Sequence, residues 1–186
     1  MRLFCAVTPT PRWIELLGKV QRDLKPLYGD AVRWVDPPLA HLTVRFIGEV
    51  GDRETENLIT LWRSVILPPQ PLVLELTTCG CFPEEGPERV LWMGAEARSG
   101  SWSELVSYCD TVLSRVGITL SEVDSVAHMT IGRVKVPSKV RGVREHLAHI
   151  SLSEDPLVVS TVGLFRSAPT PHGSRYELLA STFKVS

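Results

Sequence analysis

Two short segments of the sequence carry the same reactive pair, a histidine followed two residues later by a threonine. The first pair is His41 and Thr43, and the second is His128 and Thr130; an aliphatic residue follows each pair. Side chains alternate between the two faces of a strand, so each histidine points to the same side as its threonine. Two such strands facing each other would place two imidazoles and two hydroxyl groups in one cleft.

These four groups are suited to acid–base chemistry on a phosphate. Histidine titrates near neutral pH, so one ring can accept a proton while the other, already protonated, donates one. Threonine hydroxyl groups can hold the non-bridging phosphate oxygens as negative charge develops on them. One such pair is weak evidence, because most histidines are structural or lie at the surface. The second copy favours a shared active site over coincidence.

The sequence around the motifs does not predict a metal or a cofactor. A histidine pair can bind zinc, but zinc normally requires a third protein ligand, and no cysteine or acidic residue accompanies either motif. A Walker-type loop and a carboxylate cluster are both missing, which argues against a magnesium-dependent or nucleotide-driven reaction. The four cysteines lack the spacing of a zinc site and are expected to be buried thiols.

Length and composition are those of an ordinary globular protein. The 186 residues are 44% hydrophobic and carry a net charge of −1, which suits one domain or two small lobes. This charge gives no overall basic field for nucleic acid, although a local basic cleft remains compatible with it. No apolar run has the length of a membrane span or of a secretory signal. We therefore expect a cytoplasmic monomer that makes no membrane contact.

Hydrophobic periodicity predicts the elements that must position the two motifs. The predicted helices cover residues 11–29, 52–66, 101–116 and 138–150. The predicted strands cover residues 2–7, 31–35, 41–47, 72–81, 89–95, 127–136, 157–165 and 176–185. Residues 166–175, which are rich in Pro, Gly and Ser, are expected to link the last two strands.

The order of these elements predicts an α+β fold. Strands often follow one another in pairs, which favours antiparallel sheets with helices outside over a doubly wound parallel sheet. Each half of the chain contributes a strand-helix-strand unit and one histidine motif, a pattern typical of an internal duplication. We expect residues 1–186 to form a single bilobal domain with pseudo-twofold symmetry. In this domain two mainly antiparallel sheets face a central cleft.

The paired motifs resemble those of the two-histidine (HxT motif) phosphoesterases. Within them, the chain is similar to the RNA 2′,3′-cyclic phosphodiesterase / 2′-5′ RNA ligase family of bacteria and archaea, and the similarity covers nearly the whole chain. Besides the motifs, the matching segments are, in order, residues 2–4, 33–35, 82–83, 89–92, 165–167 and 176–178. The chain departs from the family at Ala127, where proline is common, and at Cys5, where a second aromatic residue is frequent.

The resemblance implies an enzyme that hydrolyses a 2′,3′-cyclic phosphate, at an RNA 3′ end or on a nucleotide, to a 2′-phosphate without a metal. By analogy, His128 is the proton acceptor that activates water, and His41 is the proton donor to the departing 3′ oxygen. Thr43 and Thr130 would bind the phosphate oxygens. With a 5′-hydroxyl in place of water, the reverse reaction would form a 2′-5′ linkage.

Three further residues are candidates for substrate binding. Arg133 matches the arginine that the family links to its second motif, but strict alternation points it away from Thr130 unless the strand contains a bulge or ends before it. Arg45 shares the parity of His41 and is expected to point toward the cleft, with a surface ion pair as an equally compatible role. Phe82 lies near a loop and could stack on a base or pack structurally.

Two other functions remain open at this level. The chain could be a non-catalytic module that binds RNA ends, or a phosphoesterase of small cyclic nucleotides. Intact histidines at both motif positions favour an enzyme.

Overall fold

The computed structural model describes residues 1–68, 70–120, 126–152, 155–170 and 173–183. Its helices are α1 (Pro11–Tyr28), α2 (Asp52–Ser64), α3 (Trp102–Ser114) and α4 (Val143–Ala148). Its strands are β1 (Arg2–Val7), β2 (Val32–Trp34), β3 (Leu42–Glu49), β4 (Leu72–Phe82), β5 (Val90–Ser99), β6 (His128–Val134), β7 (Leu157–Val159), β8 (Gly163–Thr170) and β9 (Gly173–Ser181). No helix among the described residues has the length and hydrophobicity needed to cross a membrane.

The strands form one sheet in the order β7-β4-β5-β6-β3-β1-β8-β9, with β2 added beside β6. All of these pairings are antiparallel. The sheet has two halves, which we call the β3 arm (β3, β1, β8, β9) and the β6 arm (β7, β4, β5, β6, β2). The two arms meet at one residue pair, Leu42 with Met129. The two motif strands are therefore the inner strands of the two arms.

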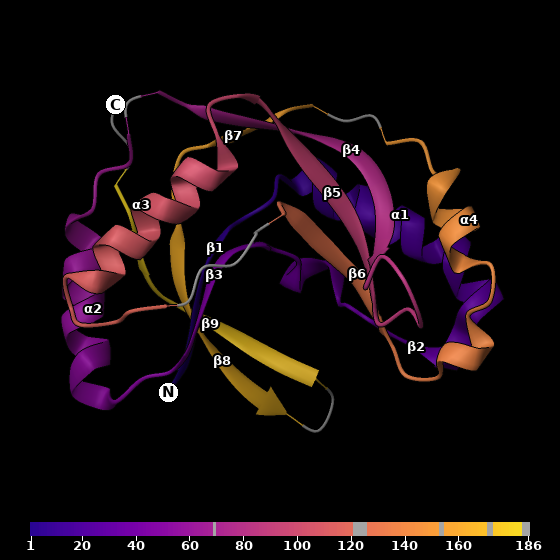
Figure 1. Cartoon of the computed structure of the whole chain (residues 1–186), viewed down its shortest axis with the longest axis horizontal. Coiled ribbons are helices and arrows are strands. Elements are labelled where there is room, and N and C mark those ends of the chain that lie inside the picture. Colours follow the sequence, from indigo (N-terminus) through magenta and orange to yellow (C-terminus); the bar gives the residue numbers. More distant parts are fainter. Residues whose placement is uncertain (69, 121–125, 153–154, 171–172, 184–186) are drawn as a thin grey trace.

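Two of the helices, α1 and α3, are exchanged between the arms (Figure 1). Helix α1 follows β1 of the β3 arm but packs against β6, and α4 packs against β4. Helix α3 follows β5 of the β6 arm but packs against β3, and α2 packs against β9. Helices α1 and α3 thus each cover the arm opposite to the one that they follow, whereas α2 and α4 each cover the arm that they follow.

Local sequence explains where the long helices begin. The side chain of Thr10 accepts a hydrogen bond from the backbone N–H of Trp13, and Pro11 opens the first turn of α1. Ser101 caps α3 in the same way through the N–H of Glu104. The apolar face of α1 is buried at Trp13, Leu17, Val20 and Leu24, at the spacing of a helix packed on a sheet.

The predicted α+β class with antiparallel strands and outer helices is confirmed. The two predicted sheets are joined through the Leu42–Met129 pair into a continuous one. The buried hydrophobic residues, among them the four cysteines, form one cluster that includes residues of both arms.

Three predicted segments in the C-terminal part of the chain were wrong. The expected strand 157–165 is divided into β7 and β8, and much of the expected linker 166–175 belongs to the β8–β9 hairpin. Strand β8 pairs with β1 only as far as Ser167, so Pro169 lies where one side of the strand is unpaired and proline is tolerated, which is why the composition there misled the prediction. The expected helix 138–150 is only α4, because Gly142 precedes it at φ 77°. The last residues of the predicted strand 176–185 lie outside the described residues.

Candidate active site

The two histidine motifs occupy equivalent positions at the junction of the arms. In both, the histidine and the threonine are half-buried, while the residues that follow each of them are buried. Leu42 lies opposite Met129 in antiparallel register. One residue to either side, His41 therefore faces Thr130 and Thr43 faces His128 across the junction. The structure thus brings the four predicted groups to one face of the sheet.

Each imidazole is held by a backbone carbonyl two residues upstream. Nδ1 of His41 donates to the carbonyl oxygen of Leu39 at 2.9 Å, and Nδ1 of His128 donates to that of Val126 at 2.8 Å. A carbonyl oxygen only accepts, so in the neutral ring the proton is on Nδ1. Nε2 of each histidine is left to exchange a proton with a ligand.

The surroundings favour neutral imidazoles in the free protein. Burial lowers the pKa of His41 below its ordinary value, and the positive charges of His128 and Arg133 lower it further, against the opposing effect of the bond to Leu39. Burial also lowers the pKa of His128, with an additional contribution from Arg133 and an opposing one from Val126.

Aromatic rings form a wall behind each histidine. The ring of His41 lies 4.9 Å from that of Phe4 and 5.0 Å from that of Tyr176, centroid to centroid. The ring of His128 lies 5.2 Å from that of Phe82 and 6.4 Å from that of Trp92. These ring contacts restrict the orientation of the two imidazoles.

The position of Phe82 is fixed by a contact of its ring and by hydrogen bonds to the loop that follows it. Its ring stacks on Trp92 at 5.1 Å. The loop that follows it is bound by Arg144 of α4, which donates to the carbonyl oxygens of Pro83, Glu84 and Gly86 and to the carboxylate of Glu88. Phe82 is therefore a fixed part of the wall beside His128, which suits either of its predicted roles.

The indole ring of Trp92 packs closely on two glycines, Gly80 and Gly94, where there is no room for a side chain. A Cβ atom on Gly80 would lie 2.5 Å from the ring, and one on Gly94 would lie 2.7 Å from it. We expect Gly80→Ala to destabilise the protein by about 1–3 kcal/mol, because the indole would have to shift. Gly18→Ala is the matched control, since a Cβ on Gly18 would meet nothing closer than 3.6 Å in a helix interior.

Urea denaturation of both variants and of the wild type measures the change in the free energy of unfolding. Gly18→Ala should raise the free energy of unfolding by about 0.5–1 kcal/mol, as expected for glycine replaced inside a helix. Equal stability of Gly80→Ala and the wild type would contradict the assigned position of the Trp92 ring.

Strand β6 contains a bulge, which turns Arg133 toward the cleft face. Along the β5–β6 pair, Trp92 lies opposite Thr130, but Val90 lies opposite Arg133, so β6 contains one extra residue between them. Trp92 and Val90 share a face of β5, and Thr130 and Arg133 therefore share the corresponding face of β6. Arg133 is exposed on this face.

Arg45 does not face the cleft, and this prediction was wrong. The β1–β3 pair has the same irregularity, with Ala6 opposite Thr43 and Cys5 opposite Arg45, so the extra residue reverses the parity of Arg45. The side chain is only 6% exposed, and its Nε donates to the carboxylate of Asp110 on α3 at 2.8 Å. Arg45 is thus paired beneath a helix, on the opposite face from the histidines.

The bulge brings Phe46 to the cleft face instead, a residue that sequence reasoning missed. Phe46 lies opposite Phe4, which contacts His41. Its ring is 49% exposed, and the guanidinium carbon of Arg2 lies 4.9 Å from the ring centre. Aligning the two motifs would have found it, because Phe46 follows His41 by the same five residues that separate Arg133 from His128.

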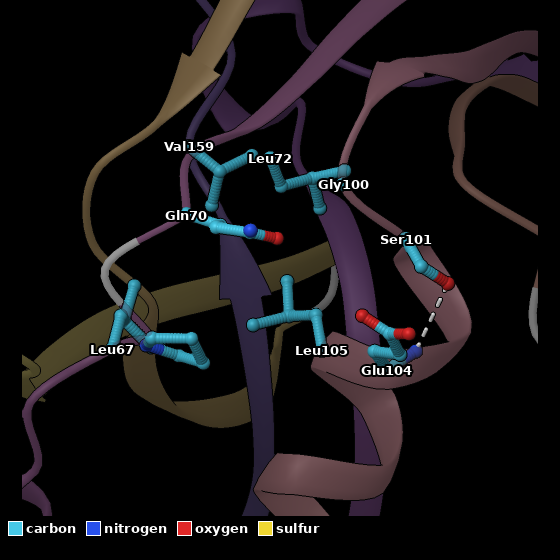
Figure 2. A pocket seen from close by; sticks show the side chains of 9 residues that line it. Leu67, Gln70, Leu72, Gly100, Ser101, Glu104, Leu105 and Val159 are labelled. Atoms are coloured by element: carbon cyan, nitrogen blue, oxygen red, sulfur yellow. Dashed lines mark hydrogen bonds between the residues drawn. The ribbon is translucent and has the colours of Figure 1, made fainter.

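The remaining polar groups do not add a metal site or a second centre of chemistry. Within the described ranges, no three His, Cys, Asp or Glu side chains are grouped as metal ligands. A cavity of about 320 Å³ lies apart from the histidines, between residues before β4 and the start of α3 (Figure 2). Its lining is Leu67, Pro68, Gln70, Leu72, Gly100, Ser101, Glu104, Leu105 and Val159.

Known proteins are similar to this chain in sequence and in fold. A family model described as LigT like phosphoesterase matches residues 7–92. The RNA 2′,3′-cyclic phosphodiesterase of Methanothermobacter thermautotrophicus is 30% identical over 178 residues, which are 95% of this chain and 95% of that protein. Its namesake in Methanocaldococcus jannaschii is 28% identical over 180 residues, which are 96% and 98% of the two chains.

Solved structures agree with these matches. TT0787 of Thermus thermophilus superposes with a TM-score of 0.73 at 24% identity, covering 99% of this chain and 97% of its own. E. coli LigT in its apo form superposes with a TM-score of 0.69 at 21% identity, covering 98% of each chain. The chain belongs to the family of LigT-like phosphoesterases.

Proposed function

We propose that this protein hydrolyses RNA 2′,3′-cyclic phosphate ends to 2′-phosphates by acid–base catalysis between His41 and His128, without a metal ion. One observation carries the proposal: two half-buried imidazoles share a cleft face, each with Nδ1 bound to a carbonyl and Nε2 left for proton transfer. The relatives named RNA 2′,3′-cyclic phosphodiesterase, and an E. coli LigT complexed with 3′-AMP, support a nucleotide substrate.

The reaction proceeds by in-line displacement at phosphorus. Nε2 of His128 takes a proton from water, and the water oxygen forms a bond to phosphorus. The bond between phosphorus and the 3′ oxygen breaks, and protonated His41 delivers its proton to that oxygen. The product carries a 2′-phosphate and a 3′-hydroxyl. The assignment of acceptor and donor follows the family resemblance.

The other groups of the cleft stabilise charge on the phosphate. The hydroxyl groups of Thr43 and Thr130 and the guanidinium of Arg133 bind the non-bridging oxygens, where negative charge increases as water attacks. A 5′-hydroxyl in the position of water would let the reverse reaction form a 2′-5′ linkage. Phe82 offers the terminal base an aromatic face beside His128.

The test is hydrolysis of an oligonucleotide with a 2′,3′-cyclic phosphate end in the presence of EDTA. We expect full turnover, and comparison with 2′- and 3′-phosphate standards should show only the 2′-phosphate. A 3′-phosphate product would contradict the direction of bond breaking, and loss of activity in EDTA would contradict the metal-independent mechanism. Binding without turnover would instead support a non-catalytic RNA-end module.

A further inference from the structure

Two arginines from neighbouring strands lie side by side next to the proposed active site. Arg33 of β2 is directly opposite Arg133 of β6. Side chains directly opposite in an antiparallel pair point to the same face and lie close together, and like charges there are destabilising. Among the described residues, no carboxylate forms an ion pair with either guanidinium. Within the described ranges, the pair therefore has no carboxylate as an ion-pair partner.

The arginine pair borders a cavity that adjoins His41. The cavity has a volume of about 140 Å³ and is lined by Arg33, Trp34, Val35, Asp36, Leu39, Arg133, Gly173, Ser174 and Tyr176. Two of these residues contact His41 directly. The carbonyl oxygen of Leu39 binds its Nδ1, and the ring of Tyr176 lies 5.0 Å from its ring. Arg133 also lines this cavity and shares the cleft face of β6 with Thr130, so a ligand in the cavity would lie next to a phosphate bound between the histidines.

The charge and shape of this cavity suit a phosphate group. Guanidinium groups bind phosphate oxygens through paired, charge-assisted hydrogen bonds. A phosphate between Arg33 and Arg133 would also relieve their mutual repulsion. Asp36 lines the same cavity, so a singly charged phosphodiester is accommodated more readily than a group of higher negative charge.

We propose that Arg33 and Arg133 form a second phosphate subsite, which binds the phosphodiester on the 5′ side of the terminal nucleotide. The inference rests on the proposed function and adds a preference to it: the enzyme selects RNA ends over nucleoside 2′,3′-cyclic phosphates. Arg133 serves both phosphates, because its charge also reaches both imidazoles. Arg33 serves the second phosphate only, since its strand pairs with the last residues of β6, past the junction where β3 pairs with Met129.

Four substrates test this subsite with the full chain. All carry a 2′,3′-cyclic phosphate; the 5′ position bears a hydroxyl, a phosphate monoester, a second nucleotide through a phosphodiester, or a second nucleotide through a neutral methylphosphonate. We expect kcat/KM for the phosphodiester to exceed that for the 5′-hydroxyl by about tenfold or more, as for a charge-assisted hydrogen bond. The methylphosphonate should lose this advantage. A monoester better than the diester would overturn the assignment to a phosphodiester.

Arg33→Ala identifies the residue that causes the preference. The ratio of kcat/KM between the phosphodiester and the 5′-hydroxyl substrate should fall to about one. The midpoint of thermal unfolding should not fall, because the substitution removes a repulsive pair. Arg53→Ala, an exposed arginine on α2, is the matched control and should keep the wild-type ratio.

The outcomes separate this inference from the proposed function. Equal kcat/KM for all four substrates, or an unchanged ratio in Arg33→Ala, would overturn the subsite while the enzyme remained a cyclic phosphodiesterase. Absence of turnover on all four would overturn the proposed function and the subsite with it.

Discussion

Replacing His41 or His128 with alanine is expected to lower kcat by about 10²–10⁴-fold, the contribution of a positioned general acid or base. Each histidine donates one hydrogen bond to a carbonyl in its own segment, so its loss should cost only about 1 kcal/mol of stability. Single-turnover kinetics on a 2′,3′-cyclic phosphate oligonucleotide, with circular dichroism as the folding control, measures both effects. His149→Ala, an exposed residue at the end of α4, should match the wild type.

The two variants also assign the roles that the geometry leaves symmetric. In the wild type, the acidic limb of the rate profile reports deprotonation of the base, and the alkaline limb reports deprotonation of the acid. His128→Ala should therefore lose the acidic limb, and His41→Ala the alkaline limb. The reverse result would exchange donor and acceptor. A single variant that keeps more than about a tenth of the wild-type kcat would contradict the paired mechanism.

The sequence was sufficient to predict that each motif histidine shares a face with its threonine, because this depends only on local alternation along a strand. Alternation along a strand places His41 with Thr43 and His128 with Thr130 whatever the partner strands do. The orientation of Arg45 depends instead on a bulge, and a bulge is set by the register with the neighbouring strand. In β6, the family resemblance indicated that Arg133 lies at the cleft. Because strict alternation would point it away, a bulge or a strand end could be predicted there. The same reasoning applied to β3 would have predicted that Phe46, and not Arg45, faces the cleft.

The exchange of α1 and α3 between the arms could not be predicted from the sequence. The apolar face of α1 is equally compatible with the sheet that precedes it and with the one that follows it. Its destination is decided by packing with β6, a contact between segments more than a hundred residues apart. The aromatic walls are similar: Trp92 and Tyr176 match core positions in the sequence, and their contacts with the histidines depend on strand order.

Arg133→Ala is expected to lower kcat/KM by about 10²–10³-fold, as for the removal of one group that stabilises transition-state charge. It should also move both limbs of the pH–rate profile to higher pH. Arg133 lowers the pKa of both His41 and His128 by disfavouring a second positive charge nearby. Without Arg133, each imidazole keeps its proton to a higher pH. The base therefore becomes active only at higher pH, and the acid stays protonated up to a higher pH.

Arg133→Lys separates these two effects. Lysine keeps the positive charge but cannot form the paired hydrogen bonds of a guanidinium. The limbs should therefore stay near their wild-type positions while kcat/KM falls by a smaller factor than in Arg133→Ala. The profiles should be measured at low ionic strength, because Arg133 is exposed and salt screens its field. If the limbs of Arg133→Ala do not move, the guanidinium is not close enough to act on the imidazoles, and the bulge in β6 does not deliver it to the reacting phosphate.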